Sequence, residues 1–151
     1  MNRSRMAARL ALFALPAGGL AGVDLLTNAL AATTDWDYHH RSLAWSVIAI
    51  ALLCGLLLVP LLPSRLAATA AGIVAGGVAG NVVSAYLNQG RVPNPFVAWQ
   101  TAFNPADVFV LAGVPMLMVA LARVAIHHRA TIDRFVPPHR WELALRRKVG
   151  L

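Results

Sequence analysis

Four long apolar runs, separated by short polar loops, dominate the sequence. They cover residues 6–31, 43–62, 66–87 and 107–126. Each run approaches or exceeds the roughly 20 residues that a helix needs to cross a hydrocarbon core of about 30 Å. Because backbone polar groups inside lipid must bond within their own segment, such runs are expected to be helical. The sequence therefore predicts an all-α fold, a polytopic membrane protein with four transmembrane helices.

The overall composition supports a membrane protein. Of the 151 residues, 58% are hydrophobic and only 13% are charged, which excludes an ordinary soluble domain. We expect a four-helix transmembrane domain over residues 1–126 and a basic cytoplasmic tail over residues 127–151. Trp141, Leu143 and Leu145 alternate with basic residues in the tail. This pattern indicates either a cationic amphipathic helix on the membrane surface or a disordered basic tail.

The distribution of basic residues predicts the orientation in the membrane. An even number of spans puts both termini on one side, and that side carries all Lys and Arg residues except Arg41 and Arg91. By the positive-inside rule, both termini are predicted to be cytoplasmic. The net charge of +7 lies near the membrane boundary, so we expect membrane lipid as its partner and no nucleic acid.

The first apolar run has two interpretations. A basic N-terminus, an apolar stretch and the small residues around Ala29 and Ala31 also describe a cleavable signal peptide. The run is long for a signal peptide, however, and Asp24 interrupts it late. Its removal would leave three spans and break the charge arrangement, so a retained helix is favoured.

Two other features suggest metal or disulfide chemistry, and both have simpler explanations. Cys54 is the only cysteine, so it makes no intrachain disulfide and is predicted to be a small core residue. Asp35, Asp37, His39 and His40 share one short loop. Such a cluster could bind a metal, but a solvated loop is the favoured interpretation. We expect no metal and no cofactor.

Small residues recur at every fourth position of the third span and end in a polar pair. They are Ser64, Ala68, Gly72, Gly76, Gly80 and Ser84, with Asn81 one turn before the last. A small-xxx-small stripe lets helix backbones approach closely. The third span is therefore predicted to pack against a neighbour along this stripe and to bring Asn81 and Ser84 to the outer end of the bundle.

Two motifs carry a resemblance to a known family. Gly-Gly-x-Ala-Gly-Asn spans residues 76–81, and Phe-Asn-x-Ala-Asp spans residues 103–107. In this order and spacing they resemble the lipoprotein signal peptidases (signal peptidase II), bacterial plasma-membrane aspartic proteases that remove signal peptides from lipid-modified prolipoproteins. The resemblance implies that Asp107 is one catalytic carboxylate. The family's other catalytic Asp and the following Arg fall on Ser84 and Ala85.

The resemblance also implies substrate-side positions. Asn81 and Asn104 keep the family residues, and Asp24 matches the acid of a D-Q-x-T-K element in which Asn28 replaces the Lys. His40 stands where the family has an Asn. Independently of the resemblance, Asn104, Pro105 and Asp107 form a strong helix start: a cap, a proline at the first helical position and an acid in the first turn.

Aspartic proteolysis requires two carboxylates that share a proton, and a serine hydroxyl cannot act as the base. The sequence thus predicts a family member that binds lipid-modified or transmembrane peptide, or a partner membrane protein, without cleaving it. On this alignment, Ser84→Asp could restore activity. Alternatives are an active peptidase, with Asp24 or a loop acid as partner or Ser84 as a nucleophile with His39 or His40, and a structural membrane scaffold.

Overall fold

Four long helices make up most of the computed structural model, which describes residues 3–31, 38–129 and 148. They are α1 (Arg3–Leu30), α2 (Leu43–Leu56), α3 (Arg65–Leu87) and α4 (Pro105–His127), with a 3₁₀ turn η2 (Val59–Leu61) extending α2. All four segments are long and apolar enough to cross a membrane. The predicted all-α, four-span fold is confirmed.

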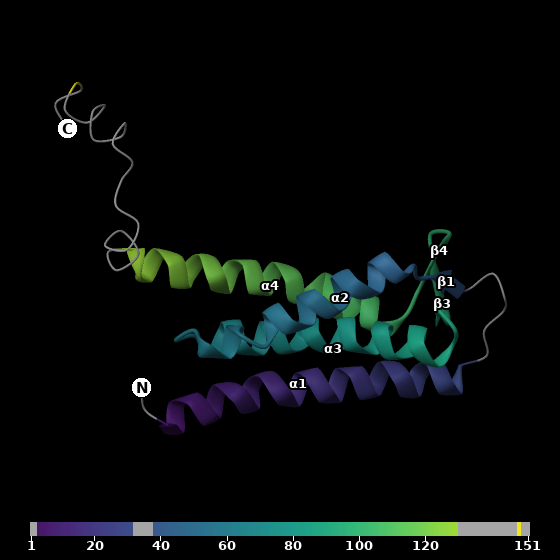
Figure 1. Cartoon of the computed structure of the whole chain (residues 1–151), viewed down its shortest axis with the longest axis horizontal. Helices are drawn as coiled ribbons and strands as arrows, with labels where there is room; N and C mark the ends of the chain where they lie inside the picture. Colours follow the sequence, from purple (N-terminus) through teal and green to yellow (C-terminus); the bar gives the residue numbers. More distant parts are fainter. Residues whose placement is uncertain (1–2, 32–37, 130–147, 149–151) are drawn as a thin grey trace.

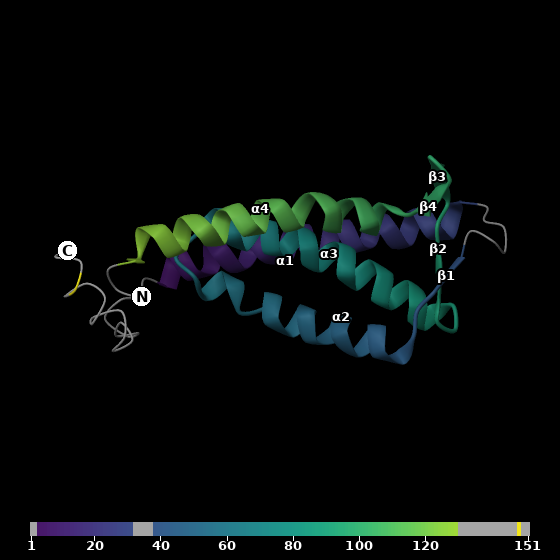
Figure 2. The same ribbon diagram turned by 90° about the horizontal axis from the view of Figure 1, so that it is seen from above.

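Helix α3 is the centre of the bundle. In the apolar middle of α3, 67% of the residues are buried, against 11–17% in the other three spans. Helices α1 and α4 flank α3, whereas α2 is set to one side and diverges from α4 towards the strand-bearing end (Figures 1 and 2). Large side chains on the outer helices, such as Leu15, Leu43 and Leu111, are exposed, as lipid-facing residues of a membrane bundle are.

The small-residue stripe of α3 packs against α1. A β-carbon on Gly76 would lie 3.0 Å from the carbonyl oxygen of Ala17, and one on Gly72 would overlap the backbone of Phe13. Gly77 faces α4 instead, because a β-carbon built on it would lie 2.5 Å from the carbonyl oxygen of Ala106. Gly72 and Gly76 therefore allow α1, and Gly77 allows α4, to approach the central helix closely.

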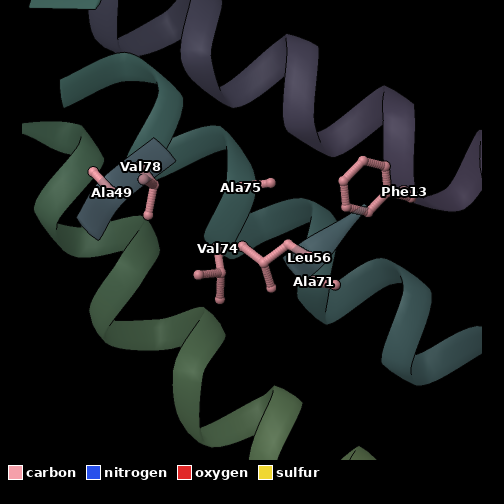
Figure 3. Packing of buried hydrophobic residues seen from close by; sticks show 7 residues of the cluster. All are labelled: Phe13, Ala49, Leu56, Ala71, Val74, Ala75 and Val78. Atoms are coloured by element: carbon pink, nitrogen blue, oxygen red, sulfur yellow. The ribbon is translucent and has the colours of Figure 1, made fainter. Parts of the chain in front are cut away.

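The apolar core lies where α3 meets α1 and α2 (Figure 3). Its buried residues are Phe13, Ala49, Leu56, Ala71, Val74, Ala75 and Val78. Cys54 is not among them: it is exposed, so the prediction of a core position was wrong. Helix α2 is aliphatic on every side and peripheral in the bundle, and Cys54 lies on its exposed side.

Four three-residue strands cap one end of the bundle, opposite the η2 turn (Figure 1). β1 (Tyr38–His40) pairs with β2 (Arg91–Pro93), and β3 (Phe96–Ala98) pairs with β4 (Thr101–Phe103), both antiparallel. Trp99 and Gln100 turn the second hairpin with positive φ. The strands lead directly into the N-terminal ends of α2 and α4, where the polar side chains gather.

Candidate functional site

Asp107 is fixed at the first turn of α4 by a reciprocal capping box. Asn104 Oδ1 accepts a hydrogen bond from the Asp107 backbone N–H at 2.9 Å. In return, Asp107 Oδ2 accepts from the Asn104 backbone N–H at 3.3 Å. The helix start predicted from Asn104 and Pro105 is therefore present. This arrangement leaves Asp107 Oδ1 available to face α3.

Two asparagines connect Asp107 to α3 and to the strands. Asn81 Nδ2 donates to Asp107 Oδ1 at 3.0 Å. Asn104 Nδ2 donates both to Asn81 Oδ1 at 2.8 Å and to the carbonyl oxygen of Pro93 at 3.3 Å. Asn81 is 5% exposed and Asn104 is 0% exposed, so the bonds that Asn104 Nδ2 donates are buried, whereas the bond from Asn81 to Asp107 is partly buried. We call Asp107, Asn81 and Asn104 the asparagine network.

A guanidinium group lies beside the same carboxylate. Arg41 Nη2 is 4.0 Å from Asp107 Oδ1, with the two side chains 21% and 34% exposed. The Arg41 guanidinium also lies over the Trp45 ring, 4.8 Å from its centroid, in cation–π geometry. The Arg41 backbone N–H donates to Gly90 at 2.8 Å, which ties this residue to the start of β2.

A cavity of about 440 Å³ lies between α2, α3 and α4. Its polar lining consists of Arg41, which lies between β1 and α2, Asn81 of α3 and Asp107 in the first turn of α4. The remaining lining is apolar: Trp45, Ile48, Ala49, Leu52, Val78, Val110 and Leu111. Among the described lining residues, Asp107 is the only carboxylate. The cavity is therefore apolar along the helices and polar at the strand-bearing end.

A second polar group lies between α1 and α3. Asp24 is 0% exposed, and its Oδ1 accepts from the Ala106 backbone N–H at 2.9 Å. Asn28 Nδ2 lies 3.1 Å from Asp24 Oδ2 and 3.2 Å from Ser84 Oγ, so it donates to both. Ser84 is 2% exposed. We call Asp24, Asn28 and Ser84 the buried acid group.

The structure brings together only some of the residues singled out in the sequence. Asn81, Asn104 and Asp107 contact one another, and Asp24 reaches the same turn of α4 through Ala106. Ser84 belongs to the buried acid group instead, and no hydrogen bond between Ser84 and Asp107 is seen in the described part of the chain.

The remaining candidates contribute little to this site. His40 is exposed on β1 and pairs with Arg91, and it does not line the cavity. Asp35 and Asp37 lie outside the described residues. Among residues 3–31 and 38–129, no three His, Cys, Asp or Glu side chains come together as a metal site would require.

Sequence reasoning missed Arg41 and Trp45 as cavity residues. Arg41 lies just before the N-cap Ser42, so its contact with Trp45 depends on the turn into α2, which no local pattern indicated. The sequence identified Asn28 only as the replacement of a family Lys and did not predict its hydrogen bonds. Asn28 bridges α1 and α3, and no local pattern encodes that contact.

Comparison with known proteins agrees with this arrangement. Searches of curated proteins and of solved structures gave no significant match. The sequence profile of the family described as "Signal peptidase (SPase) II" matches residues 9–123. The matched range contains α2, α3 and all of α1 and α4 except their terminal turns. It also contains the asparagine network and the buried acid group. The chain belongs to the signal peptidase II family.

Proposed function

We propose that this protein binds a lipid-modified or transmembrane peptide in the cavity between α2, α3 and α4 without cleaving it. One observation carries the proposal: Asp107 is the single carboxylate among the described residues that line the cavity. Proteolysis of the aspartic type needs two, one to activate water and one to donate a proton. The other polar groups beside Asp107 are an amide and a guanidinium.

Neither neighbour replaces a carboxylate. The Arg41 guanidinium offers only hydrogen-bond donors, so it cannot take a proton from water. The Asn81 amide directs its Nδ2 at Asp107 and its Oδ1 at Asn104, which uses both ends of the side chain. The arrangement is suited to holding polar groups of a ligand in place.

The cavity suits an amphipathic ligand. Its volume of about 440 Å³ lies within the ~300–1,000 Å³ of typical small-molecule pockets. The apolar walls from α2 and α4 match acyl chains or apolar side chains, whereas Arg41, Asn81 and Asp107 match a peptide backbone or a headgroup. The lining therefore offers apolar contacts for one part of a lipid-modified peptide and polar contacts for another part.

An active peptidase is the second candidate, because Asp24 also reaches the first turn of α4. Its Oδ1 accepts from Ala106, the residue next to Asp107. Against catalysis, Asp24 is 0% exposed and both of its oxygens accept hydrogen bonds. A water between Asp24 and Asp107 would first have to enter this buried group.

Binding and cleavage assays separate the candidates. We expect purified protein to bind a fluorescent peptide that carries an S-diacylglyceryl cysteine and to leave a diacylglyceryl-modified prolipoprotein intact. Ile48→Trp, which fills the cavity, should weaken binding. Ile50→Trp is the matched control, because Ile50 is exposed on the same helix and does not line the cavity.

Other outcomes identify the other candidates. Cleavage by the wild type that disappears in Asp107→Asn would establish the peptidase. A wild type that neither binds nor cleaves would favour a structural scaffold. Equal binding by the two tryptophan variants would place the ligand outside this cavity.

A further inference from the structure

A second cavity lies between the turn into α3 and the last turns of α4. Helix α4 ends on the side of the bundle opposite the strands (Figure 1). The cavity has a volume of about 430 Å³. Its polar lining consists of Ser64, Arg123, His127 and His128, and a proline and two aliphatic side chains complete it. It shares no lining residue with the cavity that contains Asp107, so the two cavities are separate.

The polar groups of this second cavity are hydrogen-bond donors suited to an anion. The Arg123 guanidinium offers five N–H donors in a planar fork, and an imidazole offers at least one. The His127 and His128 rings lie edge to face with their centroids 5.1 Å apart. Ser64 Oγ accepts from the Ala67 backbone N–H at 3.1 Å, which leaves its O–H available as a donor. The cavity thus collects donors from two segments that are far apart in the sequence.

No carboxylate balances these donors within residues 3–31 and 38–129. The acids in those ranges are Asp24 and Asp107, and both bond to groups at the strand-bearing end of the bundle. The ion pair seen in the same ranges joins Asp107 to Arg41 and does not involve Arg123. A cleft lined by cationic groups raises the local concentration of anions. The second cavity is therefore suited to an external anionic ligand.

The depth of the second cavity matches that of lipid headgroups. Arg123 and His128 follow Asp107 by 16 and 21 residues, so at about 1.5 Å per residue they lie roughly 24 and 31 Å from it along α4. The hydrocarbon core is about 30 Å thick, so Asp107 and this cavity lie at opposite membrane boundaries. Because the basic residues predict that this boundary is cytoplasmic, the nearest anions are lipids of the negatively charged inner leaflet.

We propose that the second cavity binds the phosphate group of an anionic phospholipid from the cytoplasmic leaflet. The Arg123 fork pairs with two phosphate oxygens, and Ser64 and the imidazoles donate to the headgroup. Free phosphate has the same polar chemistry, but Ile126 also lines the cavity and is 75% exposed. An acyl chain packs on this apolar surface while the phosphate occupies the cavity. A phospholipid therefore uses both the polar and the apolar lining.

A bound phospholipid contacts two helices at once. Ser64 is the N-cap of α3, the central helix, whereas Arg123 and His127 belong to the last turns of α4. A ligand that binds the folded protein and not the unfolded chain stabilises the fold as its concentration rises. Anionic lipid should therefore raise the thermal stability of the bundle, whether or not a peptide is bound at the strand-bearing end.

The test measures lipid binding and thermal midpoints of the full chain in a neutral detergent. Phosphatidylglycerol should raise the midpoint and stay bound in native mass spectra. Zwitterionic phosphatidylcholine and inorganic phosphate, each at the same concentration, should have much smaller effects. Arg123→Gln should bind phosphatidylglycerol about tenfold more weakly, because charge-assisted hydrogen bonds to the phosphate are lost. Its midpoint without lipid should equal that of the wild type, since Arg123 is exposed.

Arg5→Gln is the matched control. Arg5 is exposed in the first turn of α1 and does not line the second cavity. The first turn of α1 lies at the same end of the bundle as the last turn of α4 (Figure 1). The control removes the same charge at this end, so its affinity for phosphatidylglycerol should equal that of the wild type.

Three results would overturn the proposal. Equal affinities of the two arginine variants would show that the lipid does not use this cavity. Equal binding of phosphatidylglycerol and phosphatidylcholine would show that the site does not select an anionic headgroup. Stabilisation by inorganic phosphate as large as that by phosphatidylglycerol would identify the ligand as a free anion. None of these measurements involves a peptide, so the inference and the proposed function are tested separately.

Discussion

Gly80 of α3 lies directly against the carboxylate of Asp24 in α1. A β-carbon built on Gly80 would lie 2.8 Å from Asp24 Oδ2 and 3.1 Å from Asp24 Cβ. The absence of a side chain at residue 80 therefore makes room for the acid between the two helices. Through Ala106, the same acid bonds to the start of α4, so three helices meet at this contact.

We expect Gly80→Leu to destabilise the bundle. The side chain would displace Asp24 and force α1 away from α3, and overpacking of this kind costs about 1–3 kcal/mol. Gly76→Leu should act similarly, because its β-carbon would lie 3.0 Å from both Ala17 and Leu20. The free energy of unfolding is measured in detergent by thermal or chemical denaturation.

The control for steric contact is Gly22→Ala in α1. No atom lies within 4 Å of the β-carbon position at Gly22. Alanine in a helix is favoured over glycine by roughly 0.5–1 kcal/mol, so this variant should be neutral or more stable. Unchanged stability in both leucine variants would contradict the close packing of α3 on α1.

Two variants of Asn104 separate its capping role from its role in the asparagine network. Asn104→Ser retains a side-chain acceptor for the Asp107 N–H but loses the donors to Asn81 and Pro93. Asn104→Ala loses both roles, and loss of a cap alone costs about 0.5–2 kcal/mol. Asn104→Ala should be the less stable variant, whereas both should bind the peptide weakly.

The measurement is a thermal midpoint together with a peptide binding constant for each variant. If Asn104→Ser bound as tightly as the wild type, the cap alone would account for the role of Asn104. The bonds to Asn81 and Pro93 would then be structural, and the network would not position Asp107 for ligand.

The third prediction concerns Ser84→Asp, for which the sequence and the structure give different expectations. By alignment, this change could recreate a catalytic pair with Asp107. In the structure, Ser84 Oγ accepts from Asn28, which also donates to Asp24, so the new carboxylate would join the buried acid group. A second buried acid beside Asp24 is unfavourable. We expect lower thermal stability and no cleavage.

Ser84→Asn is the control, because it is almost the same size and adds no charge. It should be more stable than Ser84→Asp, and the difference between their free energies of unfolding measures the electrostatic cost of the second buried carboxylate. Prolipoprotein cleavage by Ser84→Asp that is lost on adding Asp107→Asn would contradict the structural argument and support the alignment.

The parts of the fold that follow from local pattern were predictable. The four spans follow from apolar length, the start of α4 from Asn104 and Pro105, and the packing of α3 from its glycines. Each of these signals is contained in one segment of the sequence. The structure moves the helix boundaries by only a few residues, apart from α2, which ends at Leu56 and continues as the η2 turn.

The contacts that define the site were harder to predict because they join distant segments. Whether Ser84 faces Asp107 or Asn28 depends on the rotation of α3 relative to α1, and an apolar helix carries little information about rotation. Helix α2 is the extreme case: it is aliphatic all round, and the burial of Cys54 was predicted wrongly. The short strands β1 and β2, which lie beside Arg41, were also not predicted.

The last prediction concerns topology, because the site must face the side from which its ligand comes. All Lys and Arg residues except Arg41 and Arg91 lie at one end of the predicted spans, so the termini should be cytoplasmic and the strands extracytoplasmic. A reporter fused after Leu151 should be cytoplasmic, and one inserted between Trp99 and Gln100, at the tip of the β3–β4 hairpin, should be extracytoplasmic.

If basic residues determine the orientation, adding them at the hairpin tip should lower the fraction of protein whose termini are cytoplasmic. Reporters that gave the same compartment would contradict the even number of spans. Reporters in the inverted compartments would place Asp107 and Asn81 on the cytoplasmic side, where a translocated lipid-modified peptide could not reach them.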